Sequence, residues 1–298
     1  MRDPVPARPA APPPGRRSRS RSGRASGRGR LGLYLLVAGT VFVSFFPTVW
    51  LFLTSIKSQA QIYAWPVEFW PSPATLENYR EIFQVSTELV RYIVNSFVVA
   101  SGMTFMILAV GGLAAYSLAR FDYRGRFAVL TGILAVSMFP PLALLPALFD
   151  LFLEIGLLNT YIGLILAHTG LYLPMAVWIL SNFYKTIPRE LEDAARMDGA
   201  SFLRIFWSVI LPLSRPGLIA TGLIVFIMSW NEFPLALVLM TDNAMRTAPV
   251  GISLFPGEFS FPWEIISAAT ILAIVPIMVI SAIFQDRIIG GLTAGSSK

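Results

Sequence analysis

The sequence contains no cysteine, a single histidine and few charged residues for its length. Only 13% of its 298 residues are Asp, Glu, Lys or Arg, against about 25% in soluble domains. Without cysteine, the chain can form neither a disulfide nor a thiolate metal site, and a lone His168 excludes a histidine cluster for metal binding or catalysis. Apolar residues make up 55% of the chain and the mean hydropathy is +0.65. This composition indicates an all-α polytopic membrane protein.

Lysine is also scarce, and none of the three lysines follows a glycine-rich phosphate loop. The chain therefore has no P-loop of its own, and we expect no cofactor and no bound metal. The net charge of +6 does not indicate nucleic acid, because nine of the 23 basic residues lie in the first 30 positions. This stretch is rich in Pro, Gly and Ser, so we expect a disordered tail that touches anionic membrane lipid.

Six apolar segments are long enough to cross a bilayer as helices, each holding roughly 20 residues or more. Two of them contain prolines that predict irregularity. Pro140-Pro141 is expected to break the third segment, and Pro212 and Pro216 to mark the entrance of the fifth, which is too long for one straight span. The segments are about Leu31–Ile56, Ile93–Leu118, Phe127–Phe149, Tyr161–Phe183, Val209–Met240 and Ile265–Phe284.

The distribution of Lys and Arg between the loops predicts the orientation. With the N-terminus inside, 19 basic residues fall on the cytoplasmic side and four outside. Both termini are then cytoplasmic. The two long outer loops, Ser58–Glu88 and Thr241–Glu264, could form a platform for an extracytoplasmic partner or an ordinary interfacial aromatic belt.

A charged island between the fourth and fifth segments predicts a helix–turn–helix in water. Pro188 suits a helix start, and acids follow in the first turns, where they favour the helix dipole. Gly199 permits a sharp turn, and Ser201 can cap a second helix. Another protein could grip the smooth face left by the island's alanines, or the hairpin could lie on lipid.

The same island resembles the cytoplasmic signature of ABC importer permeases, which reads Glu-Ala-Ala, three residues, Gly, nine residues, Ile, one residue, Leu-Pro. Here the signature appears as Asp193-Ala194-Ala195, then Gly199, then Val209 and Leu211-Pro212, with both spacings kept and two conservative departures. The resemblance covers roughly residues 31–298. It includes Trp70–Tyr79, Ala114–Arg120, Ser229–Phe233 and Gly290–Gly295, which are similar to the carbohydrate branch and to its shorter, maltose-type subunit.

This resemblance implies a type I importer transmembrane domain in a bacterial or archaeal plasma membrane, and a set of partners. These are a homologous second permease, two copies of an ATP-binding subunit and an extracytoplasmic sugar-binding protein. The domains implied are a tail at 1–30, a first transmembrane helix at 31–56, an outer loop at 57–90, a five-helix domain at 91–285 with a coupling loop at 184–208, and a second tail at 286–298. The residues implied to contact the ATPase are Glu192, Asp193, Ala194, Ala195, Asp198, Gly199, Leu211 and Pro212.

A carboxylate lies in the middle of the fifth segment, in Trp230-Asn231-Glu232. A charge at this depth is costly and normally faces a bundle interior or a cavity. The three residues could line a sugar pathway, or Glu232 could join helices within the assembly.

The leading hypothesis is a transport subunit rather than an enzyme, with ATP hydrolysed by a partner and a sugar moved inward. Resemblance favours a disaccharide such as trehalose or maltose, and glycerol phosphate or another polar solute is an alternative cargo. An ion-driven secondary carrier would need buried ionisable residues in several segments, and only Glu232 and His168 qualify. An intramembrane enzyme is disfavoured because the sequence shows no paired carboxylates and no histidine beside a nucleophile.

Overall fold

The computed structural model describes residues 27–84, 87–254 and 261–293, and these residues are helical wherever the secondary structure is regular. The basic tail predicted to be disordered lies outside the described residues up to position 26. The chain divides into two compact units, residues 1–48 and 49–298. Helix α1, Gly27–Ser55, crosses that boundary.

Four long apolar helices and two bent helix pairs account for the six predicted segments. A continuous helix spans Glu88–Arg120, and it consists of α4 (Thr87–Met106), a π-turn at Ile107–Gly111 and α5 (Gly112–Arg120). The other long helices are α1, α8 (Tyr161–Thr186) and α15 (Trp263–Thr293). Helix α15 thus runs well beyond the predicted end of the sixth segment, into the stretch predicted as a C-terminal tail.

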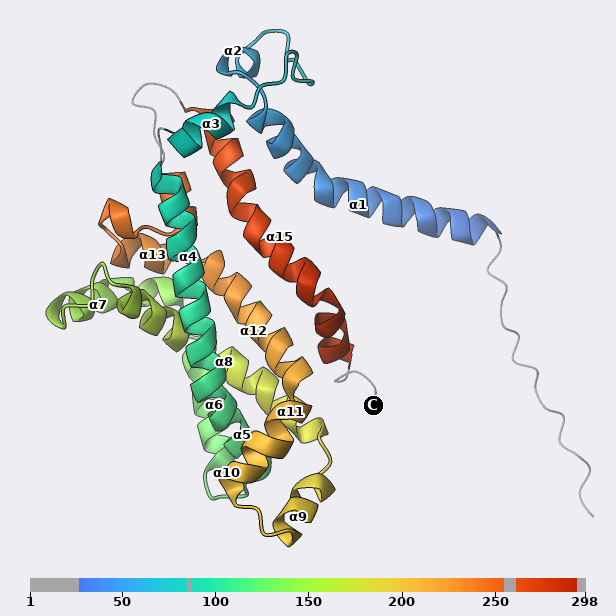
Figure 1. The fold of residues 1–298 in the computed structure, drawn as a ribbon, viewed down its shortest axis with the longest axis vertical. Helices are drawn as coiled ribbons and strands as arrows, with labels where there is room; N and C mark the ends of the chain where they lie inside the picture. Colours follow the sequence, from blue (N-terminus) through green and yellow to red (C-terminus); the bar gives the residue numbers. More distant parts are fainter. Residues whose placement is uncertain (1–26, 85–86, 255–260, 294–298) are drawn as a thin grey trace, which may run out of the picture. The chain divides into compact units, whose positions relative to one another are not determined.

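Proline breaks the third segment, as predicted. Helix α6 (Arg126–Ser137) meets α7 (Pro141–Glu154) at 90°. Residue Phe139 precedes a proline, which disfavours the helical conformation, and the two prolines supply no N–H groups to continue the helix. Figure 1 shows α7 projecting sideways from the long helices.

The fifth segment, Val209–Met240, is not one straight span, as its length predicted, and Pro216 lies in the first turn of its main helix. Helix α12 covers only Arg215–Trp230, and a short α13, Pro234–Leu239, follows after a break. On the other side, the stretch Phe202–Leu213 meets α12 at 75°. That stretch contains α10 (Phe202–Ile205), a π-turn (Phe206–Ile210) and α11 (Leu211–Leu213). The π-turn stands just before Pro212, which cannot donate an ordinary helical hydrogen bond.

Small residues allow the long helices to approach one another closely, as is usual in membrane bundles. Helix α12 packs against α4, α8 and α15, while α5 packs against α8 (Figure 1). A Cβ placed on Gly217 of α12 would lie 2.5 Å from the Phe183 ring of α8. This crossing therefore requires glycine.

Short helices occupy the two ends of this bundle. At one end lie α2 (Gln59–Ile62), α3 (Glu77–Gln84), a 3₁₀ turn (Asn243–Met245) and α14 (Ala248–Ser253). At the other end, α9 (Glu190–Met197) projects beyond α8 and α10 (Figure 1). We call these the α3 end and the α9 end. A core cluster near the α9 end joins α5, α8 and the π-turn at Phe206–Ile210, and it includes Tyr116, Tyr184 and Phe206.

Candidate functional site: the α9 hairpin and the break in the fifth span

The charged island folds as the predicted helix–turn–helix. Helix α9 begins at Glu190, two residues after Pro188, and acids occupy its first turn. At its end, Gly199 has a φ of 78°. The Gly199 N–H donates to Arg196 O at 2.9 Å and the Ala200 N–H to Ala195 O at 3.0 Å. These two bonds form a Schellman cap, which closes the helix and reverses the chain.

The second helix of the hairpin is also capped as predicted. Ser201 has an extended backbone, and its Oγ accepts a bond from the Arg204 N–H. Ring stacking then fixes this helix to the bundle, since the Phe202 and Tyr116 rings stack with centroids 5.5 Å apart. Leu211 is half-buried against the same core, whereas Pro212 is exposed.

The two neighbouring acids of α9 face opposite ways. The Asp193 side chain is 65% exposed and pairs only with Arg196 of the same helix, 3.1 Å away. The Glu192 side chain is 3% exposed, and its Oε1 lies 2.6 Å from Arg120 Nε of α5. The Tyr116 hydroxyl donates to Glu192 Oε2 at 2.9 Å. Glu192 was predicted to contact an ATPase, but its carboxylate points back into this chain.

The exposed surface of the hairpin includes four of the other predicted coupling residues. Asp193, Ala194, Asp198 and Gly199 are exposed, and Ala195 is half-buried against the core. A Cβ on Gly199 would meet nothing within 4 Å, so its open surroundings leave the turn accessible. These positions are small or acidic, and the exposed Leu191, Arg196 and Met197 lie beside them on α9.

A buried polar cluster fixes the break in the fifth span. Glu232 Oε1 accepts from the Leu235 N–H at 2.8 Å, and its Oε2 accepts from the Ala236 N–H at 3.0 Å. The carboxylate thus satisfies the first N–H groups of α13, which have no partner within that helix. His168 of α8 lies against the same carboxylate, with Nε2 3.1 Å from Oε2.

The cluster also contains a serine, because His168 Nδ1 lies 2.8 Å from Ser229 Oγ. A histidine thus lies beside a serine hydroxyl, which the sequence did not indicate. The three side chains have the composition of a hydrolase triad. However, His168 is 0%, Ser229 4% and Glu232 8% exposed, so a substrate has no access to the hydroxyl in this structure.

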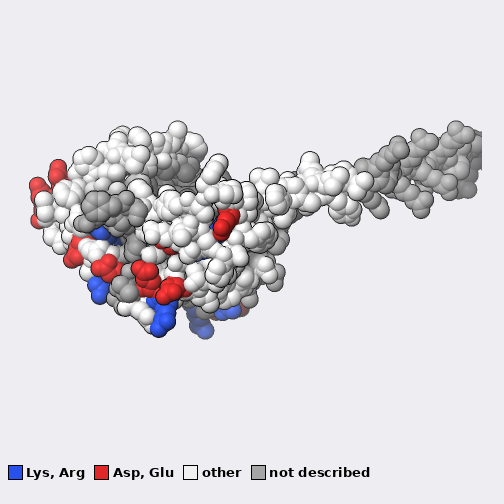
Figure 2. Space-filling model, turned by 90° about the horizontal axis from the view of Figure 1, so that it is seen from above, with Lys and Arg blue, Asp and Glu red and all other residues white. Residues whose placement is uncertain are grey.

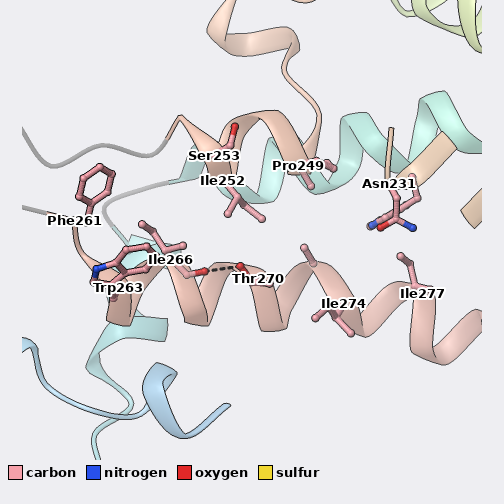
Figure 3. A pocket seen from close by; sticks show the side chains of 13 residues that line it. Asn231, Pro249, Ile252, Ser253, Phe261, Trp263, Ile266, Thr270, Ile274 and Ile277 are labelled. Atoms are coloured by element: carbon pink, nitrogen blue, oxygen red, sulfur yellow. Dashed lines mark hydrogen bonds between the residues drawn. The ribbon is translucent and has the colours of Figure 1, made fainter. Parts of the chain in front are cut away.

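Two residues of Trp230-Asn231-Glu232, Trp230 and Asn231, line a cavity. Asn231 is exposed, while Trp230 and Glu232 are buried. The cavity measures about 380 Å³ and lies between the end of α12, α14 and α15. Figure 3 shows Asn231 at one end and Phe261 and Trp263 at the other. The two rings stack with centroids 5.7 Å apart.

The polar lining of this cavity is sparse. Beside Asn231, the hydroxyl residues Ser253 and Thr270 line it, and the described lining contains no Asp, Glu, Lys or Arg. Stacked aromatic faces with an amide and hydroxyls suit an uncharged polar ligand. Among the described residues, no group of three His, Cys, Asp or Glu side chains could hold a metal ion.

The two outer-loop segments meet at the α3 end. The Tyr63 hydroxyl donates to Phe261 O at 2.9 Å, and Asn243 Nδ2 donates to Glu88 Oε1 at 2.8 Å. Figure 2 views this end, where acidic and some basic side chains lie scattered over a largely uncharged surface. Exposed acids here include Glu77, Glu81 and Asp242.

Comparison with known proteins gives the class that this fold and hairpin define. Residues 84–292 match the family described as the inner membrane component of binding-protein-dependent transport systems. The chain belongs to this family and is an inner-membrane permease.

Three curated relatives are permease proteins of named transport systems. One, for sulfoquinovosyl glycerol in Agrobacterium fabrum, is 42% identical over 85% of this chain and 88% of its own. The trehalose/maltose permease MalG of Thermococcus litoralis is 36% identical over 89% and 96%. The trehalose permease SugB of Mycobacterium tuberculosis is 37% identical over 90% and 98%.

The fold is that of solved ABC importers. A chain of the bacterial importer of the acidic polysaccharide alginate matches with a TM-score of 0.77, at 22% identity, over 88% of this chain and 97% of its own. The MetNI methionine transporter matches with a TM-score of 0.51, at 17% identity, over 71% and 98%.

Proposed function

We propose that this chain is one permease subunit of an ATP-driven sugar importer, forming half of its translocation pore. The observation that carries the proposal is the α9 hairpin, whose cap, buried anchor and exposed small-residue surface form a rigid projection. The signature spacing in the hairpin and the family match support the same role. The excess of basic residues in the loops at the α9 end favours a cytoplasmic location for it, with both termini inside.

In this proposal, the ATP-hydrolysing partner is a separate subunit present in two copies. It grips the exposed surface formed by Asp193, Ala194, Asp198 and Gly199. A homologous second permease completes the pore, and an extracytoplasmic sugar-binding protein delivers cargo to the α3 end. The acidic side chains there suit a partner with a basic contact surface.

We infer that the cavity beside Asn231 is this chain's part of the sugar route. Aromatic rings at its mouth can stack on a sugar face, and the amide can bond to hydroxyl groups. Because its described lining is uncharged, a neutral disaccharide such as trehalose or maltose suits it better than a sulfonated sugar.

The test is reconstitution of the chain with its partner permease, ATPase and binding protein in proteoliposomes. ATP inside the vesicles should drive uptake of labelled trehalose or maltose, with no proton or sodium gradient present. Uptake that follows an ion gradient and ignores ATP would refute the proposal.

A further inference from the structure

The buried carboxylate of Glu192 connects α9 to the second span. The Arg120 guanidinium forms an ion pair with this carboxylate and also donates through Nη2 to Ile187 O at 2.7 Å. Ile187 lies in the linker between α8 and α9. One side chain of α5 therefore holds both the entrance of the hairpin and its first helix, and the Tyr116 hydroxyl adds a third contact.

These contacts are buried, and the ion pair is strong because water is excluded from it. The Arg120 side chain is 5% exposed and that of Glu192 is 3% exposed. Removal of one partner from a buried ion pair leaves an uncompensated charge, which is far more costly than the loss of a surface pair. A displacement of α9 therefore cannot leave α5 behind without breaking this connection.

The helix that carries Arg120 continues without interruption to Glu88, over 33 residues. At 1.5 Å per residue it is roughly 50 Å long. Its far end is fixed in a similar way to the outer loop. The Tyr92 hydroxyl donates to Asn243 Oδ1 at 2.6 Å, and Asn95 Nδ2 donates to Ala244 O and Arg246 O at 2.9 and 2.8 Å.

We propose that Tyr116, Arg120 and Glu192 form a positioning clasp, which makes the 88–120 helix a lever between the α9 hairpin and the 243–246 segment. The inference rests on the proposed function, because the lever has a task only if a partner displaces α9. The π-turn at 107–111 is the one irregular turn of this helix, and there a Cβ on Gly111 would lie 2.9 Å from Leu173 Cδ1 of α8. Because the helix is held against α8 at this turn, the turn is the point about which the lever rotates.

The first experiment measures the clasp without any partner. Because the chain lacks cysteine, a spin label on Met197→Cys is unique, and Met197 is 89% exposed on α9. Label mobility is recorded for the full-length chain in lipid nanodiscs, alone and with Glu192→Gln or Tyr116→Phe. The control is Asp122→Asn, which removes an exposed ion pair with Arg126 at the α9 end. Mobility should rise in both clasp variants and stay unchanged in the control.

The second experiment places the same variants, without the label, in the reconstituted importer. Sugar uptake per ATP hydrolysed should fall about tenfold with Glu192→Gln, less with Tyr116→Phe, and not at all with Asp122→Asn. Unchanged label mobility in Glu192→Gln would refute the clasp, whatever the importer does. Raised mobility with unchanged uptake per ATP would refute the lever. If the unmodified chain imports no sugar, the proposed function fails, while the mobility measurement still decides whether the clasp exists.

Discussion

Replacement of Gly199 by alanine should weaken the coupling of the importer while leaving the fold intact. Gly199 closes the α9 cap with a φ of 78°, and a Cβ there would meet no atom within 4 Å. The cost of the substitution is therefore backbone strain alone, about 1–2 kcal/mol for a non-glycine residue in the left-handed region. That energy corresponds to a roughly 5- to 30-fold shift in the local equilibrium between closed and opened turn.

A matched control exists at the other end of α8. Gly156 has a φ of 69° and equally open surroundings. It precedes α8, whereas Gly199 lies beyond the C-terminal end of that helix. Alanine at either position should lower the melting temperature of the purified permease by a similar amount. Only Gly199→Ala should reduce sugar uptake per ATP, since only that turn belongs to the proposed contact with the ATPase.

The assay is uptake of labelled sugar together with phosphate release, in proteoliposomes that contain all subunits. A Gly199→Val variant should be more severe, because a β-branched residue tolerates a positive φ poorly. The reasoning would be refuted if Gly199→Ala and Gly156→Ala lowered the melting temperature equally and both kept normal uptake per ATP.

Three further predictions follow from the contacts described. Asn231→Leu should raise the sugar concentration needed for half-maximal uptake, at unchanged melting temperature. An unchanged half-maximal concentration would show that Asn231 does not contact the sugar. Glu232→Leu should destabilise the chain by about 3 kcal/mol or more, because it leaves N–H groups of α13 and the His168 ring without their partner; thermal unfolding measures this, and a loss below 1 kcal/mol would contradict it. Ser201→Ala should cost about 1 kcal/mol through loss of the cap on α10, whereas Ser137→Ala, which removes a hydroxyl bonded only within its own helix, should cost less in the same measurement.

Local chemistry made much of the fold predictable. The Pro140-Pro141 break, the Gly199 turn and the Ser201 cap each depend on a residue and its immediate neighbours, and the structure has all three. The second break in the fifth span was missed. Trp230-Asn231-Glu232 lies in an apolar run, and the break is stabilised by His168, which is 64 residues away in the sequence.

The neighbouring acids Glu192 and Asp193 of α9 show that local sequence also cannot predict which way a side chain faces. Sequence spacing placed Glu192 and Asp193 together in the coupling signature, and it could not show that they face opposite ways. The partner that draws Glu192 inward is 72 positions earlier, at Arg120, in a stretch that the sequence marked only as similar to carbohydrate permeases. The signal available in the sequence for this ion pair was an arginine at the end of one apolar segment and a glutamate in a later loop.

By itself, the sequence determined the membrane class, the order of the apolar segments and the family, because composition, hydropathy and motif spacing are properties of the linear chain. The tertiary structure decided which polar groups are buried and against what. It turned Glu192 toward Arg120, sealed His168 with Ser229 and Glu232, and left Asn231 facing a cavity. The physical reason is that a buried charge is tolerated only where a partner meets it, and those partners come from distant segments that only folding brings together.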